Sequence, residues 1–359
     1  MTLHEPHPNS IYDVHSGMPE SGKPKLKINL NKALIFLGVV VVGFIIIFIV
    51  WWNNEIVINN GISITNRDEV TKSLITGLDC VSADSRPIAI MLASDVETRP
   101  LSGISQADMV FEMPVDPTGI TRFMAIFQCE KPKEIGSVRS ARNDFIPLVA
   151  GIGAVYAHWG GEHGALEKLN SRVVDNVDAL KYEGEIFYRK SGIRPPHNGF
   201  TNLDLITKTA QNLKYDLKNN FSGYPHQKDI PKKNLSNLAN QINISYPGRY
   251  AVGWTYDSET NSYKRFRGGS AENDKDNGQI VKAGVVVVMN TSSKFLREQY
   301  ISVDVQGEGV VQIYQNGMVV NGKWSKDPLK LDSKLYFYDD SGKEIKLAPG
   351  KIWVEIVTQ

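Results

Sequence analysis

The pattern of apolar and polar residues divides this chain into three parts. Residues 33–52 form a run without any charged side chain, about the length that an α-helix needs to cross the roughly 30 Å hydrocarbon core of a bilayer. Lysines precede the run and two tryptophans end it, a distribution typical of a helix whose N-terminal flank is cytoplasmic. We therefore expect a cytoplasmic tail over residues 1–32, a single transmembrane helix over residues 33–52 and an extracytoplasmic part over residues 53–359.

Two alternatives to an uncleaved membrane anchor are open. A cleaved signal peptide has an apolar core of about 7–15 residues that ends in small residues, whereas this run is longer and ends in Trp51 and Trp52. A buried core helix would carry a polar face, which this run lacks. No cysteine stands near the end of the run, so the sequence does not indicate a lipid attached there.

After residue 53, short apolar runs alternate with segments of helical spacing. The short runs predict strands, at residues 88–92, 108–115, 121–127 and 154–157. The helical spacing predicts helices, at residues 140–149, 164–169 and 201–213. This alternation predicts a three-layer α/β domain over residues 86–215, which a stalk over residues 53–85 joins to the membrane helix.

In the last third of the chain the helix signals end. Apolar segments separated by turn pairs such as Asn316–Gly317 and Ser341–Gly342 predict antiparallel strands. We expect a polar linker over residues 216–245 and a smaller, mostly antiparallel β domain over residues 246–359. The predicted fold class is therefore α/β, with a three-layer α/β domain followed by a β-rich domain and preceded by one transmembrane helix.

Charge and cysteine content narrow the classes of partner. The chain has 40 basic and 39 acidic residues, so it lacks the basic excess that a nucleic-acid-binding surface requires. Cys80 and Cys129 both fall in the predicted external part, where a disulfide between them and two free thiols are both compatible with the sequence. Neither the cysteines nor any other motif predicts a bound metal or cofactor.

The first candidate site is an anion-binding segment at a predicted strand-to-helix junction. Arg139, Ser140 and Arg142 lie at the start of the predicted helix. A helix N-terminus offers unpaired N–H groups, and two guanidinium groups with a hydroxyl would complete a site for phosphate or carboxylate. The alternative is that both arginines pair with internal acids such as Glu112 or Asp144.

His158 is the candidate residue of a second loop, directly after a predicted buried strand. Ligands of open α/β sheets bind beyond the carboxyl ends of the strands. His158 is therefore either a general base or hydrogen-bonding group in a cleft, or a histidine satisfied by backbone groups at a strand end. The spacing of His158, Glu162 and His163 does not match the usual zinc signatures.

A third loop contains Arg189, His197 and Asn198. Two consecutive prolines before His197 stiffen this loop and hold its side chains in fixed directions. Arg122 and Glu112 lie on neighbouring predicted strands, where they either form an internal pair or extend the cleft. The full set of predicted ligand-binding residues is Glu112, Arg122, Arg139, Ser140, Arg142, His158, Arg189, His197 and Asn198.

Several motifs resemble one family of bacterial envelope proteins. They are Arg86-Pro-Ile-Ala-Ile-Met, Arg99-Pro-Leu-Ser-Gly-Ile-Ser-Gln-Ala-Asp108, Gly119-Ile-Thr-Arg-Phe123, Gly136-Ser-Val-Arg-Ser-Ala-Arg142, His158-Trp-Gly-Gly161, Pro196-His-Asn198, Gly307-Glu-Gly309, Asn316-Gly317, Gly322-Lys-Trp324 and Pro349-Gly-Lys-Ile-Trp353. Through them, residues 84–359 are similar to the YerB-like family. This resemblance implies two consecutive domains of unknown function in the cell envelope, and no particular reaction. Many relatives are lipoproteins, whereas this chain has an apolar run and no cysteine to acylate.

Three functions are compatible with these features. The first is a single-pass, extracytoplasmic envelope protein that binds an anionic cell-wall polymer, or regulates a wall-synthesis protein, through an Arg/His-lined cleft. The second is an enzyme acting on a phosphorylated glycan or lipid-linked substrate, by architectural analogy with the LytR-CpsA-Psr proteins. In that enzyme the arginines would hold phosphates and Glu112 or Asp144 would hold a metal. His158 or His197 would act as base. The third is a scaffold whose polar loops are structural, and no residue is assigned as catalytic.

Overall fold

The structure, a computed structural model, describes residues 41–50, 71–229, 238–297 and 299–358. Residues 67–359 form one compact unit and residues 1–66 belong to another. Residues 41–50 are helical. Within the described ranges, no helix has both the length and the apolar content that a membrane span requires. The rest of the predicted span, residues 33–40 and 51–52, lies outside the described residues.

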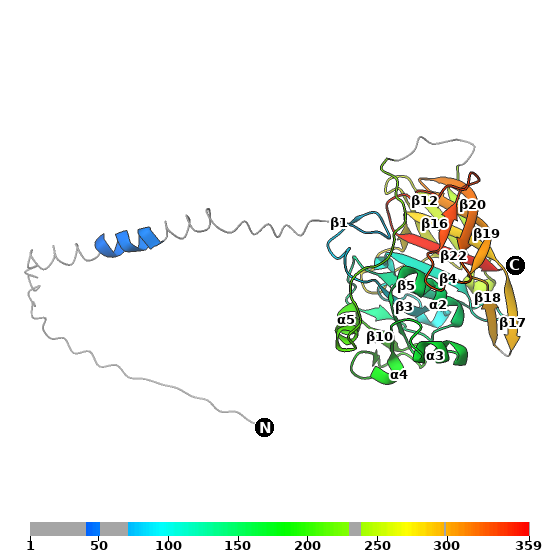
Figure 1. The fold of residues 1–359 in the computed structure, drawn as a ribbon, viewed down its shortest axis with the longest axis horizontal. Helices are drawn as coiled ribbons and strands as arrows, with labels where there is room; N and C mark the ends of the chain where they lie inside the picture. Colours follow the sequence, from blue (N-terminus) through cyan, green and yellow to red (C-terminus); the bar gives the residue numbers. More distant parts are fainter. Residues whose placement is uncertain (1–40, 51–70, 230–237, 298, 359) are drawn as a thin grey trace, which may run out of the picture. The chain divides into compact units, whose positions relative to one another are not determined.

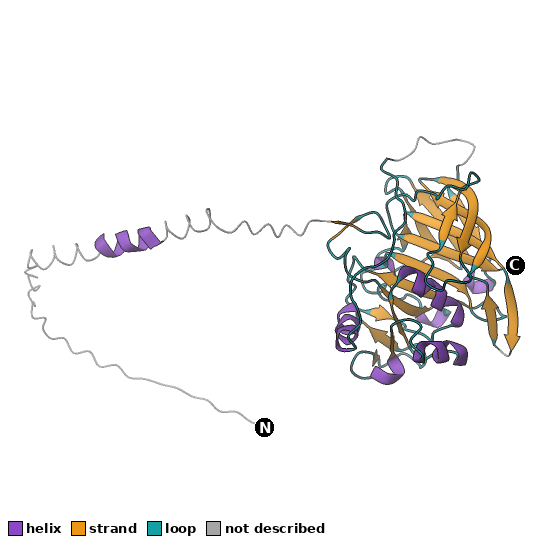
Figure 2. Ribbon diagram, viewed as in Figure 1, coloured by secondary structure: helices purple, strands orange, loops and turns teal. Residues whose placement is uncertain are grey.

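A ten-stranded mixed sheet organises the larger unit (Figures 1 and 2). In spatial order its strands are β21 (Tyr336–Tyr338), β20 (Met318–Lys326), β19 (Gly307–Gln315), β16 (Val285–Thr291), β22 (Ile352–Thr358), β4 (Met109–Pro114), β5 (Thr121–Phe127), β3 (Ile88–Ala93), β7 (Val155–His158) and β8 (Asn176–Asp178). The last strand of the chain, β22, lies parallel to both β16 and β4. The sheet is therefore continuous from the first half of the chain to the second.

The smaller elements surround this sheet. Three strands form one small sheet, β6 (Ile135–Gly136), β10 (Gly199–Thr201) and β9 (Tyr188–Arg189). Five form another, β11 (Gln241–Ile244), β12 (Val252–Asp257), β13 (Ser262–Arg267), β14 (Ser270–Ala271) and β15 (Lys282–Ala283). Two hairpins pair β1 (Thr71–Lys72) with β2 (Asp79–Cys80), and β17 (Ser293–Arg297) with β18 (Tyr300–Val303). The helices are α2 (Ile146–Ile152), α3 (His163–Asn170), α4 (Ala179–Tyr182) and α5 (Leu203–Asn212), and the short 3-10 helices are η1 (Val96–Thr98), η2 (Ile104–Gln106), η3 (Asn143–Phe145) and η5 (Gly248–Tyr250).

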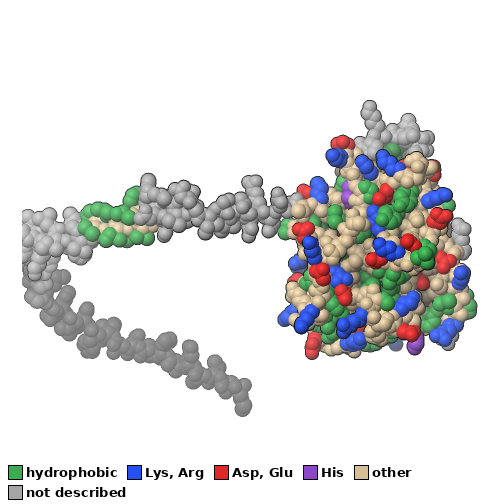
Figure 3. Space-filling model, in the orientation of Figure 1, with side chains coloured by type: hydrophobic (Ala, Val, Ile, Leu, Met, Phe, Trp, Pro, Cys, Tyr) green, Lys and Arg blue, Asp and Glu red, His purple; other side chains and the backbone are tan. Residues whose placement is uncertain are grey.

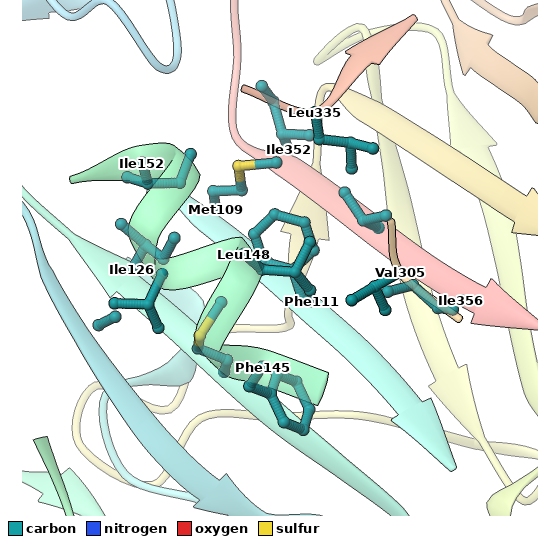
Figure 4. Packing of buried hydrophobic residues seen from close by; sticks show 14 of the residues in the cluster. Met109, Phe111, Ile126, Phe145, Leu148, Ile152, Val305, Leu335, Ile352 and Ile356 are labelled. Atoms are coloured by element: carbon teal, nitrogen blue, oxygen red, sulfur yellow. The ribbon is translucent and has the colours of Figure 1, made fainter. Parts of the chain in front are cut away.

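Side chains of the central sheet alternate between two cores, as the period of two along a strand requires. On the first face, Met109 and Phe111 of β4 pack with Phe145 and Leu148 (Figure 4). Helix α3 covers the same face through Ala165 and Leu169. The opposite face packs against α5 and the five-stranded sheet. The expected mixed α/β character is present, but strands outweigh the few short helices.

A disulfide between Cys80 and Cys129 ties β2 to the segment after β5. The two residues are 49 positions apart in the chain, and their Cα atoms are 5.3 Å apart. A cross-link of this kind removes conformations from the unfolded chain, which typically stabilises a fold by about 2–4 kcal/mol.

An internal ion network fixes the five-stranded sheet against the central sheet. It consists of Glu112, Arg265, Arg267, Glu272 and Glu355, all buried. Both arginines donate to the Glu112 carboxylate. Nε of Arg265 lies 2.9 Å from Glu272 Oε2. The arginines alternate along β13 with residues that face outward, so both reach the same interior point.

The surroundings shift the pKa values of two network carboxyl groups in opposite directions. Burial raises the pKa of Glu355 to about 8, with the charge of Glu112 adding to that rise and Arg265 opposing it. Burial would also raise the pKa of Glu112, but the charges of Arg267 and Arg265 dominate and lower it. At neutral pH, Glu355 is therefore protonated and Glu112 is ionised. The ionised Glu112 carboxylate then accepts from both arginines.

Replacing Arg265 by Met is expected to destabilise the fold by about 3–5 kcal/mol. The substitution leaves Glu112 and Glu272 without one of their two cationic partners, and a buried charge that loses its partner is costly. The measurement is urea unfolding of the full chain in mild detergent. Arg297→Met on the exposed strand β17 is the matched control, expected to change stability by less than about 0.5 kcal/mol. An equally small loss for Arg265→Met would contradict the role given to the network.

Replacing Glu355 by Gln is expected to change how stability depends on pH. The pKa of Glu355 is raised from 4.5 to about 8 in the folded protein, so the folded state binds more protons than the unfolded state between these values. Its contribution to stability is complete below pH 4.5 and is lost as pH rises through about 8. The variant keeps the hydrogen-bonding shape without the ionisation, so it should gain stability relative to wild type across this window. Parallel stability curves for the two proteins would refute the assignment.

Candidate functional site

Three arginines gather on the first face of the central sheet, and we call Arg122, Arg139 and Arg142 the arginine cluster. Arg122 lies on β5, where the neighbouring even-numbered residues Met124 and Ile126 face the core that α2 covers. Arg139 and Arg142 lie in the segment between β6 and α2. That segment runs along the end of β3, since the Arg139 amide donates to the Met91 carbonyl at 2.9 Å.

Arg122 is the innermost member of the cluster, with only 4% of its surface exposed. Burial, together with the positive charges of Arg142 and Arg139, lowers the pKa of Arg122 to about 9, and the charge of Asp95 opposes this shift. Its Nε has no hydrogen-bond partner among the described residues. An arginine in water titrates above pH 12, so these surroundings disfavour its charge strongly.

Carboxylates balance the cluster only in part. Asp95 Oδ2 is 4.0 Å from Nε of Arg139, and Glu162 Oε2 is 3.9 Å from Nε of Arg142. These distances exceed those of hydrogen-bonded ion pairs. The cluster therefore has three positive charges against two loosely placed negative ones. Such an arrangement can bind an anion whose oxygens reach several guanidinium groups at once.

The acids expected to neutralise these arginines lie elsewhere. Glu112 points to the opposite face of the sheet, where it joins the internal ion network. Asp144 accepts a hydrogen bond from the Val303 amide at 2.8 Å, and burial raises its pKa to about 6. The alternation of side chains along β4 and β5 thus separates Glu112 from Arg122. The two predictions for these residues, that they form an internal pair or that they line one cleft, are therefore both wrong.

His158 is enclosed at the end of β7 and is inaccessible to solvent. Its Nδ1 lies 2.8 Å from the Gly160 carbonyl oxygen, and its Nε2 lies 3.3 Å from Asn176 Oδ1. Burial lowers the pKa of His158, while Asp178 at 3.7 Å opposes that shift. Because both ring nitrogens face internal acceptors, this histidine holds the strand end and the following turn. It cannot serve as a base for an external substrate without leaving that position.

Arg189 and Asn198 in the third loop bond mainly to each other and to nearby groups. Arg189 donates to the Asn198 side chain at 2.9 Å, pairs with Glu183, and lies 4.3 Å from the centre of the Trp159 ring. Its charge is therefore neutralised locally. Asn202 caps α5 by accepting from the Leu205 amide. Neither Arg189 nor Asn198 contributes free charge to the arginine cluster.

His197 lines a pocket of about 560 Å³ beside the arginine cluster. Glu97, Arg194 and Pro195 line the same pocket. The link to the cluster is direct, because Arg139 donates to the Pro196 carbonyl at 3.3 Å. Ser140 is half-buried in the segment that carries Arg139. The predicted set therefore divides, with Arg122, Arg139, Ser140, Arg142 and His197 near this side of the molecule and Glu112 behind the sheet.

Sequence reasoning missed the two acids of the cluster, Asp95 and Glu162. Asp95 lies two residues after the end of β3, and Glu162 directly precedes α3. Both residues lie beside predicted strands or helices. Their positions near the same strand ends as the arginines could have identified them from the sequence. Among the described residues there is no group of three or more His, Cys, Asp or Glu side chains that could hold a metal.

Comparison with known proteins identifies two family models along the chain. Residues 75–216 match the N-terminal domain of "Protein of unknown function (DUF3048)", and residues 242–354 match its C-terminal domain. A curated relative, "Putative lipoprotein YerB" of Bacillus subtilis (strain 168), is 30% identical over 292 residues, which cover 80% of this chain and 86% of the relative. The crystal structure of the Bacillus subtilis YerB protein superposes with a TM-score of 0.72 at 29% identity, covering 80% of this chain and 97% of that one. The resemblance inferred from the motifs is confirmed.

Replacing His158 by Ala is expected to lower stability and to leave anion binding unchanged. The substitution removes the hydrogen bonds of the ring to the Gly160 carbonyl and to Asn176 Oδ1, at a cost of about 1–3 kcal/mol. Urea unfolding and a pyrophosphate titration of the full chain measure the two effects. His163→Ala, at an exposed position, is the control for both. Loss of pyrophosphate binding by a fully stable His158 variant would show that this residue belongs to the site.

Proposed function

Because the chain belongs to the DUF3048 family with its tandem N-terminal and C-terminal domains, we propose that it is a membrane-attached envelope protein that binds a phosphate-bearing ligand. The ligand binds at the arginine cluster, outside the cytoplasm. The relative named as a putative lipoprotein supports attachment to a membrane. In this chain the uncharged run over residues 33–52 would provide a single-pass anchor in place of a lipid.

The disulfide supports the location. Disulfides persist in oxidising compartments and are rare in the cytosol of most organisms. Cys80 and Cys129 are paired, and both follow the predicted anchor in sequence. An anchor with its N-terminus inside would place the folded unit and its disulfide outside the cytoplasm.

The burial of Arg122 is the observation that carries the proposed activity. A guanidinium that loses water without gaining a carboxylate costs free energy, and Arg122 is in that state. An anion bound among the three arginines would supply the missing charge and hydrogen-bond acceptors. The guanidinium groups come from two separate segments, and they lie close enough that the charges of Arg142 and Arg139 lower the pKa of Arg122. A tetrahedral phosphate, with oxygens in several directions, suits that geometry better than a planar carboxylate with two.

Binding is better supported than phosphoryl transfer. An enzyme of the second class needs a base and a metal ligand beside the phosphates. His158 is enclosed by internal acceptors, and Glu112 is bound by Arg265 and Arg267 on the other face. Two of the residues assigned to that mechanism are therefore committed elsewhere, whereas the arginines remain grouped.

Arg122→Met is expected to abolish anion binding without destabilising the protein. The substitution removes a poorly compensated buried charge and keeps a similar volume, a change that is often neutral or stabilising by about 1–4 kcal/mol. Wild-type protein should gain about 2.7 kcal/mol of stability at a pyrophosphate concentration one hundred times Kd. The variant should show no gain. Thermal unfolding of the full chain with and without pyrophosphate measures both effects.

Arg172→Gln is the matched control, because Arg172 is an exposed arginine after α3. It should retain the full pyrophosphate effect. Retention of that effect by Arg122→Met would reject the arginine cluster as the site. A variant that loses both stability and binding would be followed by Arg142→Gln, whose guanidinium is closer to the surface and whose loss should weaken binding with little change in unfolding.

A further inference from the structure

A second positively charged groove lies on the other side of the loop that carries Asp95. Its volume is about 420 Å³. The charged residues that line it are Arg99, Arg249, Arg267 and Glu272, from the loop after β3, η5, β13 and the segment after β14. Val96, Pro100 and Ala271 supply apolar walls. Three arginines therefore face one glutamate in this groove.

The positive charge of Arg99 is not neutralised by a carboxylate. Its Nε and one terminal nitrogen donate to the Ser94 carbonyl at 3.2 and 2.9 Å, and the other terminal nitrogen donates to the Arg249 carbonyl at 3.0 Å. The guanidinium lies over the Tyr250 ring at 5.4 Å. These contacts hold the Arg99 guanidinium in one orientation but do not neutralise its positive charge. Burial lowers the pKa of Arg99, and the charge of Arg267 lowers it further.

The remaining charges of the groove leave an excess of positive charge. Glu272 is within 2.9 Å of Arg265 and 3.4 Å of Arg267, so the internal ion network already uses its carboxylate. Arg249 is exposed. Arg267 is paired with Glu112 in the same network, so Arg99 and Arg249 carry the excess positive charge of the groove. This excess differs from the face in view in Figure 3, where basic and acidic side chains are interspersed.

One loop separates this groove from the arginine cluster. Asp95, at the start of the loop, lies 4.0 Å from Arg139 of the cluster, and Arg99, at its end, lines the groove. Four residues of fully extended chain span at most about 14 Å, so the two anion-attracting regions are close. A flexible chain of linked phosphates could reach from one region to the other across residues 95–99.

We propose that the groove of Arg99 and Arg249 is a second anion subsite, and that the ligand is a linear chain carrying repeated phosphate groups. The inference rests on the proposed function for its first subsite and adds the class of ligand. Short phosphates bind the arginine cluster alone. Longer chains occupy both regions, and the second contact is then intramolecular, so affinity rises through effective concentration.

The test compares pyrophosphate with long-chain polyphosphate in calorimetric titrations of the full chain in mild detergent. Wild-type protein should bind the long chain at least about tenfold more tightly per chain than pyrophosphate, beyond the statistical gain from multiple phosphates. Arg249→Gln, at an exposed position, should remove most of that difference and leave pyrophosphate affinity unchanged. Arg99→Gln should act in the same way. Arg172→Gln controls for the loss of one exposed arginine.

The outcomes separate the two proposals. If pyrophosphate binding is lost in Arg122→Met, and the long chain gains affinity that Arg249→Gln removes, both proposals are supported. A second outcome is that pyrophosphate binds at the cluster while long-chain polyphosphate binds no more tightly than pyrophosphate, or binds equally tightly to wild type and Arg249→Gln. Either result rejects the second subsite and leaves the first in place. If Arg122→Met binds pyrophosphate like wild type, the proposed function fails. A poly-glutamate chain that binds as tightly as polyphosphate would overturn the assignment to phosphate.

Discussion

The internal ion network around Glu112 is the constraint on which the rest of the fold depends. Glu112 belongs to β4 in the first half of the chain, whereas Arg265 and Arg267 belong to β13 in the second. A buried charge without its partner costs several kcal/mol, so the two halves must meet in the register that pairs these groups. Strand β22 contributes Glu355 directly beside Glu112. The segments matched by two family models therefore share one interior and one continuous sheet.

The period of two along each strand also decides where free charge is available. Glu112 and Arg122 are close in the sheet, yet they project from opposite faces and enter different environments. On one face the guanidinium groups meet buried carboxylates and are neutralised. On the other, Arg122 meets Arg139 and Arg142, and the nearest acids stay at 3.9 Å or more. Sheet geometry thus produces a balanced interior and an unbalanced site from residues of the same types.

Local pattern predicted the buried strands well and long-range pairing poorly. It also placed the start of a helix at residue 140, whereas α2 begins at Ile146 and Ser140 lies before it. The runs at 88–92 and 121–127 are strands β3 and β5 nearly to the residue, because buried strands are continuous apolar runs bounded by turns. The insertion of β22 between β16 and β4 depends on contacts between distant segments, which periodicity does not encode. Arg139 and Arg142 were predicted together at a strand-to-helix junction, whereas Arg122 was predicted on a separate strand beside Glu112. The pairing of Glu112 with Arg265 and Arg267 was missed. The sequence of β13 shows that alternate residues are basic, but it does not show which acidic residues they contact.

The arginines of the internal ion network are closely paired with carboxylates, whereas those of the arginine cluster are not. This contrast indicates why the cluster keeps its excess positive charge. The internal ion network shows that this fold can surround a buried arginine with carboxylates, at 2.9 Å for Arg265 and Glu272. Around Arg122 the described residues supply no such carboxylate, and the charge of Asp95 opposes the lowering of its pKa only in part. Asp95 and Glu162 instead hold the outer arginines loosely. They limit repulsion within the cluster without forming close ion pairs, so guanidinium donors remain available to an incoming anion. Arg99, fixed by carbonyl oxygens that orient it without cancelling its charge, repeats the same solution on the other side of the loop.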